Sequence, residues 1–313
     1  MKLKDVVMLG GLAAIWGSSF LFIKIGAMAL GPAALIELRV LLATLALLVF
    51  AYVRRHRVRI LHRWWQYLVL GATNAAIPFT LIATAELRLD SGLAAILNAT
   101  TPMFTAIVAW LWTKDPFTLG KLAGVLLGIV GVGVLVGGSG SHGAGLWLPA
   151  GFSLLAALAY GVAGVFSARH FHGETPLDMA IGQQLAATLV LLPVSLLTWR
   201  YAEPSGTVVF AVVMLAVVCT AAAYLLYFAL IHSVGALRTL TVTFLVPVFA
   251  VVWGAVFLGE AISWRTVVGL AVILSSVALV VRRGRRAEVA GRQAVADPRA
   301  VTLADDGASE RRL

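Results

Sequence analysis

The chain has 313 residues, of which 61% are hydrophobic and 12% are charged, with a net charge of +10. Soluble globular proteins carry about 25% charged residues, so this composition excludes an ordinary soluble domain. The basic residues lie in short clusters between apolar runs, which is typical of membrane loops, so we expect a lipid bilayer and no nucleic acid as the partner.

Ten apolar runs are about 20 residues long, the length that a helix needs to cross a bilayer. They cover residues 6–27, 31–53, 64–86, 91–113, 117–137, 147–168, 177–199, 207–231, 235–258 and 264–282. We therefore predict an all-α integral membrane protein with ten transmembrane helices. A Gly-rich linker at 137–145 divides it into halves at 1–138 and 146–283, and residues 284–313 form a basic tail predicted to be disordered.

The distribution of Lys and Arg predicts the orientation, because cytoplasmic loops are enriched in both. With the N-terminus inside, 19 of these residues lie in cytoplasmic loops or in the tail, and only Arg88, Arg200 and Arg265 lie outside. We expect a multi-pass protein of the inner (plasma) membrane with both termini in the cytoplasm.

A weak internal repeat relates residues 91–136 to residues 236–281 without a gap. Its landmarks are a proline within an apolar helix, Pro102 and Pro247, and an acid thirteen positions later, Asp115 and Glu260. Since each half has five spans, an odd number, the second copy must enter the membrane from the opposite side. Inverted repeats of this kind are the architecture that many secondary transporters use.

Several short motifs resemble one transporter family. They are Trp16-Gly17-Ser18-Ser19-Phe20 followed by Lys24, Pro32 followed by Arg39, Pro102 and Pro247, and the acids Asp115 and Glu260 before Gly124 and Gly269. Over residues 6–282 the chain resembles the drug/metabolite transporter (DMT) superfamily, of the ten-helix type with two EamA repeats. The resemblance implies transport of a small solute. Two departures are Lys114-Asp115 in place of the usual Gly-Glu, and Gln184 at the position that repeats Arg39.

Polar residues beside the two prolines are candidates for binding the solute, since polar groups within a membrane are costly. Asn98 and Thr101 share one helix face beside Pro102, and Thr243 lies at the equivalent position before Pro247. A proline frees the carbonyl four residues earlier, here those of Asn98 and Thr243. Either these groups coordinate a solute, or the hydroxyls bond their own helices in a packed kink.

Further polar and aromatic residues lie on faces of other predicted helices: Trp16, Asn74, Tyr160, Thr220 and Tyr224. Together with Asn98, Thr101, Pro102, Thr243 and Pro247 they form the predicted substrate-binding set. A lining of aromatic rings and uncharged polar groups suits a small amphipathic or zwitterionic metabolite. The alternative for each residue alone is packing.

Four charged residues lie within predicted spans: Lys24, Glu37, Arg39 and Glu86. Pairing between opposite charges is the favoured interpretation, and contact with a solute carboxylate is the alternative. Glu37 or Glu86 is also a candidate carrier of a coupling proton, because a low dielectric favours the neutral carboxyl. Asp115 and Glu260 are interpreted as caps of the helices that follow them.

Other features point to structure rather than to chemistry. Gly120, Gly124 and Gly128 form a ridge suited to close helix packing, within the bundle or in a homodimer. The pair His170 and His172 with Glu174 has no further ligand nearby, so we predict no metal and no cofactor.

Secondary transport is the function that the sequence favours, since there are paired repeats and no nucleotide-binding loop. We predict an exporter of small metabolites, such as amino acids or related amphipathic compounds, that works by alternating access and is not an enzyme. An intramembrane enzyme or a sensory or structural membrane protein remains the alternative.

Overall fold

The computed structural model describes residues 2–137, 145–198 and 204–296, and throughout these ranges the regular structure is helical. The first half contains α1 (Leu3–Leu30), α2 (Pro32–Val53), α3 (Trp64–Gly71), α4 (Ile77–Ala85), α5 (Ser91–Asn98), α6 (Thr101–Thr113) and α7 (Leu119–Val136). The second half contains α8 (Trp147–His170), α9 (Pro176–Thr198), α10 (Gly206–Val213), α11 (Ala223–Val234), α12 (Ala236–Thr239), α13 (Val242–Leu258) and α14 (Trp264–Ala296).

Short segments of other geometry join some of these helices into longer rods. The 3-10 turn η1 (Leu61–Arg63) precedes α3, the π-helical segment η2 (Ala72–Ala76) joins α3 to α4, and the π-helical segment η4 (Met214–Ala222) joins α10 to α11. Within the described ranges, nine helical stretches are long and apolar enough to cross a membrane, and α13 is a shorter apolar helix. With α12 before it, α13 fills the ninth predicted span, so the all-α membrane fold is confirmed.

The helix α14 continues beyond the predicted end of the last span. Its backbone is helical to Ala296, within the segment that the sequence predicts to be disordered from residue 284. Ala and Arg are abundant there, and both favour a helix. Residues 297–313 lie outside the described part of the chain, so disorder there stays a prediction.

The two repeats have the same backbone landmarks. The helices α6 and α13 end at Thr113 and Leu258, which are equivalent positions in the repeat. Both are followed by a left-handed residue, Lys114 (φ 60°) and Gly259 (φ 68°). Lys114 therefore takes the conformation that Gly259 adopts more easily. The departure noted in the sequence changes the residue but leaves the turn intact.

The two prolines, in contrast, occupy different places in their helices. Pro102 is the second residue of α6, directly after a break between α5 and α6. In the first turn of a helix the backbone N–H groups have no acceptor within the helix, so the missing N–H of a proline costs no hydrogen bond there. Pro247 lies inside the continuous helix α13, and the break in the second repeat comes earlier, between α12 and α13. The expectation of two equivalent proline kinks is therefore corrected.

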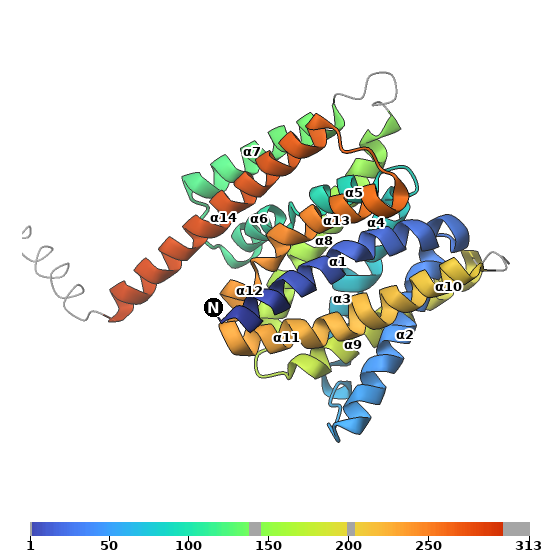
Figure 1. The fold of residues 1–313 in the computed structure, drawn as a ribbon. Helices are drawn as coiled ribbons and strands as arrows, with labels where there is room; N and C mark the ends of the chain where they lie inside the picture. The colour runs from blue at the N-terminus through green and yellow to red at the C-terminus, as the bar shows by residue number, and fades with distance from the viewer. Residues whose placement is uncertain (1, 138–144, 199–203, 297–313) are drawn as a thin grey trace, which may run out of the picture.

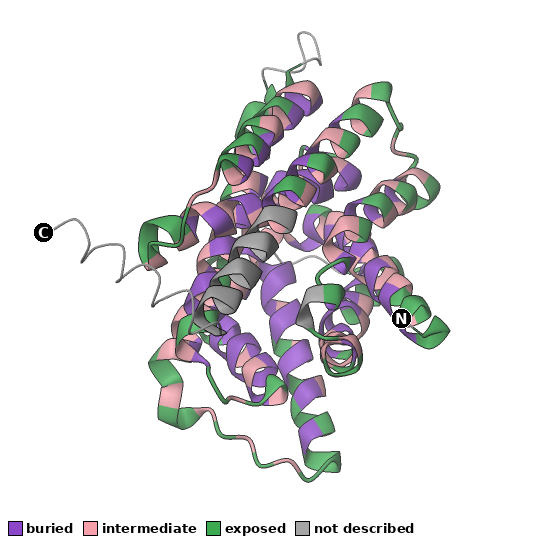
Figure 2. Ribbon diagram, turned by 90° about the vertical axis from the view of Figure 1, so that its left-hand side faces the viewer, coloured by how far each residue is buried: buried purple, intermediate pink, exposed green. Residues whose placement is uncertain are grey.

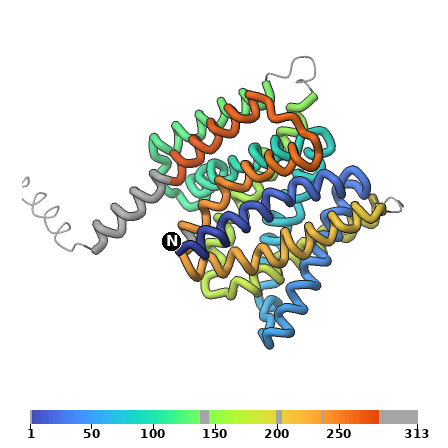
Figure 3. Tube along the Cα trace, viewed as in Figure 1, coloured from blue at the N-terminus to red at the C-terminus, as the bar shows by residue number. Residues whose placement is uncertain are grey.

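Helices from opposite halves of the chain pack against one another. The helix α1 lies along α13, α8 packs against α6 and α4, α2 packs against α9, and α7 packs against α14 (Figure 1). The trace in Figure 3 shows the blue first helix beside the orange segment of residues 242–258. Because each half covers apolar faces of the other, the buried residues gather between the helices and exposed residues lie outside (Figure 2).

Glycines allow the closest of these contacts, and they do so symmetrically. A Cβ at Gly17 would lie 2.6 Å from Cβ of Phe249 and 3.0 Å from the nitrogen of Ala250. A Cβ at Gly161 would lie 2.9 Å from the nitrogen of Thr105, which is the repeat equivalent of Ala250. The pairs α1–α13 and α8–α6 therefore touch backbone to backbone at equivalent points.

The predicted glycine ridge of α7 is used within the bundle. A Cβ at Gly124 would meet Val280 and Ser276 of α14, and one at Gly128 would meet Met103 of α6. These contacts account for the ridge without a second copy of the chain, and whether the protein is a monomer or a homodimer stays open.

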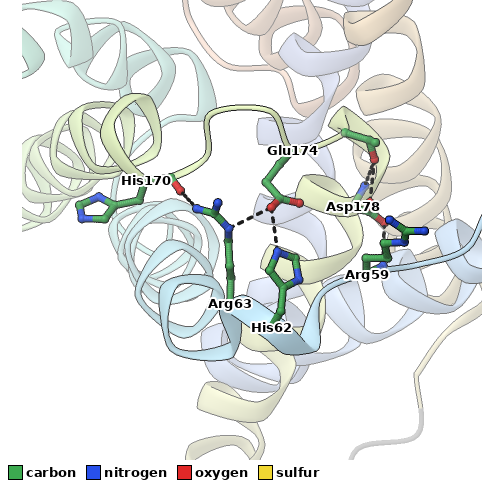
Figure 4. A network of polar contacts seen from close by, with 7 residues as sticks. Arg59, His62, Arg63, His170, Glu174 and Asp178 are labelled. Carbon is green, nitrogen blue, oxygen red and sulfur yellow. Dashed lines mark hydrogen bonds and ion pairs between the residues drawn. The ribbon is translucent and has the colours of Figure 1, made fainter.

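Polar contacts join the loops that ten crossings would place on the same side. In Figure 4, Glu174 accepts a hydrogen bond from His62 (3.0 Å) and forms an ion pair with Arg63 (3.0 Å), and Arg63 also donates to the carbonyl of His170. At the same end, Ser233 donates to Asp5 (2.8 Å). Glu174 is thus engaged in tying the loop before α3 to the loop before α9. The cytoplasmic location of this end stays a prediction.

Substituting Gly17→Ala or Gly161→Ala should destabilise the protein by about 1–3 kcal/mol, because an added methyl group would collide with backbone atoms of the partner helix. Thermal unfolding in detergent measures the effect. The matched control is Gly11→Ala on α1, where a Cβ would meet nothing within 4 Å. Equal melting temperatures for all three variants would contradict this packing.

Candidate functional site

Two π-helical segments occupy equivalent positions in the repeats. The repeat alignment places Ala72–Ala76 on residues 217–221, which lie inside Met214–Ala222. In the second segment the hydroxyl of Thr220 donates to the carbonyl of Leu215 (2.8 Å), five positions earlier. Such π-helical turns often occur at functional sites, because they displace side chains from their regular α-helical positions. Here the two segments carry Asn74 and Thr220 toward the middle of the bundle.

Arg39 lies at the centre of the molecule. Its side chain is buried, its Nε donates to Oγ1 of Thr220 (2.9 Å), and its guanidinium carbon lies 3.7 Å from the centre of the Phe79 ring. In the described part of the chain, no carboxylate lies within ion-pair distance of Arg39. Among the described residues, a hydroxyl and a ring face are thus the direct contacts of this buried positive charge, which is a costly arrangement without an anion.

A second set of hydrogen bonds surrounds this arginine. Nδ2 of Asn74 donates to Oε1 of Gln183 (2.7 Å), and Gln183 also interacts with Tyr224. Arg39 interacts electrostatically with Tyr160 and with Tyr224. We call Arg39, Asn74, Tyr160, Gln183, Thr220 and Tyr224 the central polar cluster.

The central polar cluster has contributions from both repeats. Arg39 comes from α2 and Asn74 from η2, whereas Tyr160, Gln183, Thr220 and Tyr224 come from α8, α9, η4 and α11. Tyr160 and Tyr224 are both half-buried. Five of the sequence-predicted residues thus meet at one place.

Gln183 is the member of the cluster that the sequence reading missed. The gapless repeat pairs Arg39 with Gln184, but α2 begins at Pro32 and α9 at Pro176. If these two prolines are aligned with each other, the number of residues that separates equivalent positions in the two repeats is smaller by one than in the gapless alignment. The shorter offset pairs Arg39 with Gln183, so the prolines would have identified it. Gln184 is buried, and its amide atoms have no hydrogen-bond partner within the described ranges.

Trp16 is linked to the cluster only through other rings. It packs on Tyr227 with the ring centres 5.4 Å apart, Tyr227 contacts Phe228 at 5.8 Å, and Phe228 stacks on Tyr224 at 6.0 Å. Trp16 therefore forms the far end of an aromatic row, and the structure does not place it in contact with Arg39.

The residues around the helix breaks bond mainly to their own helices. The hydroxyl of Thr101 donates to the carbonyl of Asn98 (2.7 Å), and the hydroxyl of Thr243 donates to that of Leu240 (2.8 Å). The packed-kink alternative thus describes both threonines. Oδ1 of Asn98 is buried and has no partner among the described residues, so this amide keeps an unused acceptor.

The charged residues in the spans do not form the expected pairs. Lys24 donates to the carbonyl of Leu89 (2.6 Å), and the carboxylates of Glu37 and Glu86 are buried without a hydrogen-bond partner among the described residues. Glu86 interacts electrostatically with Lys24, Arg39 and Glu260 at longer range. The Lys24 ammonium instead donates to the carbonyl of Leu89, and Nε of Arg39 instead donates to the hydroxyl of Thr220.

Glu260 caps a helix, but not the one that follows it. Its carboxylate accepts hydrogen bonds from the first residues of α5, in the other repeat. Ser263 performs the capping of α14 by accepting from the nitrogen of Thr266 (3.1 Å). In the first repeat Thr118 caps α7 in the same way, and Asp115 is exposed. The predicted role of the two acids is corrected accordingly.

Comparison with known proteins identifies the family. A profile of the EamA-like transporter family matches residues 4–137 and 147–282, which is most of the chain and each half separately. The chain belongs to the EamA-like transporter family. The resemblance of its motifs to the DMT superfamily is thereby confirmed, and the central polar cluster lies between two EamA units.

Several curated relatives of this EamA protein are transporters by name. The chain is 26% identical to the uncharacterized transporter YvbV of Bacillus subtilis, over 89% of this chain and 92% of the relative. It is 28% identical to the uncharacterized inner membrane transporter YedA of Escherichia coli, over 85% and 87%. It is also 28% identical to a probable terminal-alkyne amino-acid exporter of Streptantibioticus cattleyicolor, over 92% and 98%.

A solved crystal structure has the same fold as this EamA protein. It superposes with a TM-score of 0.64 at 17% identity, covering 91% of this chain and all of the other. The described helices therefore follow an architecture already known from experiment.

Adjacent glutamines allow a test of the central polar cluster. Gln183→Leu should destabilise the protein by about 1–3 kcal/mol, because Asn74 and Tyr224 lose their shared partner. Gln184→Leu should be neutral or stabilising, because it removes a buried amide without partners. Melting temperatures in detergent compare the two, and a larger loss for Gln184→Leu would contradict the assignment.

Proposed function

We propose that this EamA-family transporter exports small metabolites, amino acids or related amphipathic compounds, across the inner membrane. The solute binds at the central polar cluster, and the halves 1–138 and 146–283 rock to expose it to either side. Both termini lie in the cytoplasm. Support for a carboxylate-bearing solute comes from Arg39 and from the name of the amino-acid exporter among the relatives.

Arg39 is the observation that carries the proposal. A permanent positive charge inside an apolar bundle is unfavourable unless an anion or several strong acceptors compensate it. Thr220 supplies one neutral acceptor, and Glu86 interacts with Arg39 only at longer range. A solute carboxylate would complete the site with two-pronged hydrogen bonds, for which the planar guanidinium is suited.

The uncharged members of the cluster would bind the rest of the solute. Asn74, Gln183 and Tyr224 present amide and hydroxyl groups, and Phe79, Tyr160 and Phe228 supply ring faces. This mixture fits an amphipathic molecule, in which a charged end and an apolar end meet different surfaces. The unused acceptor of Asn98 is a further contact proposed for the polar end.

The position of the cluster between the repeats supports alternating access. Since its members come from both halves, a rotation of one half against the other changes which end of the bundle reaches Arg39. Secondary transporters with inverted repeats place their sites in this way, near the middle of the membrane. We propose transport without catalysis, driven by a solute or proton gradient.

Tyr224→Ala and Asn98→Ala should each reduce amino-acid flux into proteoliposomes by about tenfold or more, as expected for losing a contact worth about 1.4 kcal/mol. Insertion into the membrane should be unchanged. The matched control is Tyr52→Ala, since Tyr52 is an exposed tyrosine at the end of α2. Normal flux in both variants would remove the two residues from the site.

Proton coupling is the second part of the proposal, with Glu86 as the proposed carrier because it interacts with both Lys24 and Arg39. An imposed pH gradient should accelerate flux through the wild-type protein and should have no effect on Glu86→Gln. Glu37→Gln is the comparison, since the Glu37 carboxylate is also buried without a partner among the described residues. Wild-type flux that ignores the gradient would refute proton coupling.

A further inference from the structure

One carboxylate joins the two repeats at the end of the bundle opposite to the network of Figure 4. Oε1 of Glu260 accepts from the nitrogen of Ser91 (2.7 Å), and Oε2 accepts from Oγ of Ser91 (2.8 Å) and the nitrogen of Gly92 (3.3 Å). Glu260 follows α13 of the second repeat, and Ser91 begins α5 of the first. A carboxylate at the N-terminus of a helix is favourable, since that end carries partial positive charge.

The backbones come close together at this contact, beside a cavity that Gly92, Val251 and Glu260 help to line. A Cβ at Gly254 would collide with Oε2 of Glu260 and would lie 2.6 Å from Oγ of Ser91. A Cβ at Gly92 would lie 3.0 Å from Cα of Val251. The two helices therefore touch along their backbones, and the Glu260 carboxylate closes the contact.

The other repeat has an acid at the equivalent position, but in a different environment. The repeat alignment relates Glu260 to Asp115, and the start of α5 to residues 236–237 at the start of α12. The preceding residues, Gly259 and Lys114, have the same left-handed backbone. Yet the Asp115 side chain is exposed, whereas Glu260 is half-buried against its helix. In an inverted repeat these two acids lie at opposite ends of the bundle.

We infer that Glu260 is a gating residue, which holds the repeats closed at its own end of the bundle. When this end opens, Asp115 makes the equivalent bond to the start of α12 and closes the other end. This inference rests on the proposed alternating access. It is linked to the interior through Glu86, which interacts electrostatically with both Glu260 and Arg39.

The chain contains its own reporter for this gate. Cys219 is its one cysteine, is buried, and lies beside the central polar cluster, 3.5 Å from the hydroxyl of Ser18 and in electrostatic contact with Arg39. A membrane-impermeant maleimide applied to one side of the membrane will reach Cys219 only when that side is open. The readout needs no knowledge of the solute.

The experiment compares labelling rates of Cys219 from each side, in intact cells and in inverted vesicles. Glu260→Gln should raise labelling several-fold from the Glu260 side and lower it from the other. Asp115→Asn should do the opposite, and Glu260→Asp, which keeps the carboxylate, should restore much of the wild-type ratio. Rates that are unchanged, absent in every variant, or altered equally on both sides would overturn the inference.

A crosslink tests the same gate without removing Glu260. A Cβ at Gly92 would lie 3.4 Å from Cβ of Val251, close to the separation of about 3.5–4.5 Å in disulfides. Oxidation of Gly92→Cys with Val251→Cys should abolish labelling of Cys219 from the Glu260 side, and a reductant should restore it. Persistent labelling after complete crosslinking would contradict the gate.

The two proposals can fail separately. If Tyr224→Ala retains full amino-acid flux while the labelling ratios of Glu260→Gln and Asp115→Asn shift in opposite directions, the gate is upheld and the proposed site is wrong. If Tyr224→Ala abolishes flux and the labelling ratios do not move, the site is upheld and the gate is wrong.

Discussion

The permanent positive charge of Arg39 is the constraint around which the centre of this protein is arranged. Within an apolar bundle, each polar group must find its partner inside the chain. The nearest groups, Thr220 and the face of Phe79, compensate this charge only in part. The π-helical turns bring Asn74 and Thr220 into the same region and so concentrate the remaining polar atoms there. The described residues place no carboxylate within ion-pair distance of Arg39, and this is the place that the proposed solute carboxylate would take.

The second organising feature is that the repeats cover each other rather than themselves. The principal contacts α1–α13, α6–α8, α2–α9 and α7–α14 all cross between the halves. Neither half could bury its apolar faces alone, apart from those that meet lipid. Two of the polar contacts at the ends of the bundle also cross between the halves, since Glu260 reaches α5 and Glu174 reaches the loop before α3. Each end of the molecule is thus held by residues from both repeats. At one end the Glu260 carboxylate bonds the start of a helix, and at the other the Glu174 carboxylate contacts the side chains of His62 and Arg63.

Much of this architecture can be predicted from the sequence, because span lengths and repeat landmarks are local properties. Five members of the central polar cluster also follow from helix faces. Gln183 does not, because the offset between the repeats is one position shorter at α2 and α9 than at α7 and α14, and a gapless comparison conceals this. The hydrogen-bond partners of Lys24 and Glu260 depend on which helices become neighbours. The same is true of the absence of a carboxylate next to Arg39 among the described residues. Helical periodicity alone gives no information about such contacts.

The contacts at Gly17 and Gly161 bear on how such a molecule could move. Where large side chains interlock, one helix can turn on another only if the side chains withdraw and repack. At these two crossings one of the two surfaces has no side chain, because Gly17 faces Phe249 and Ala250 directly and Gly161 faces Phe104 and Thr105. Few side-chain atoms would therefore have to withdraw for α1 to turn on α13, or α8 on α6. These two crossings lie at equivalent points of the repeats, so the same freedom is available on both halves of the molecule.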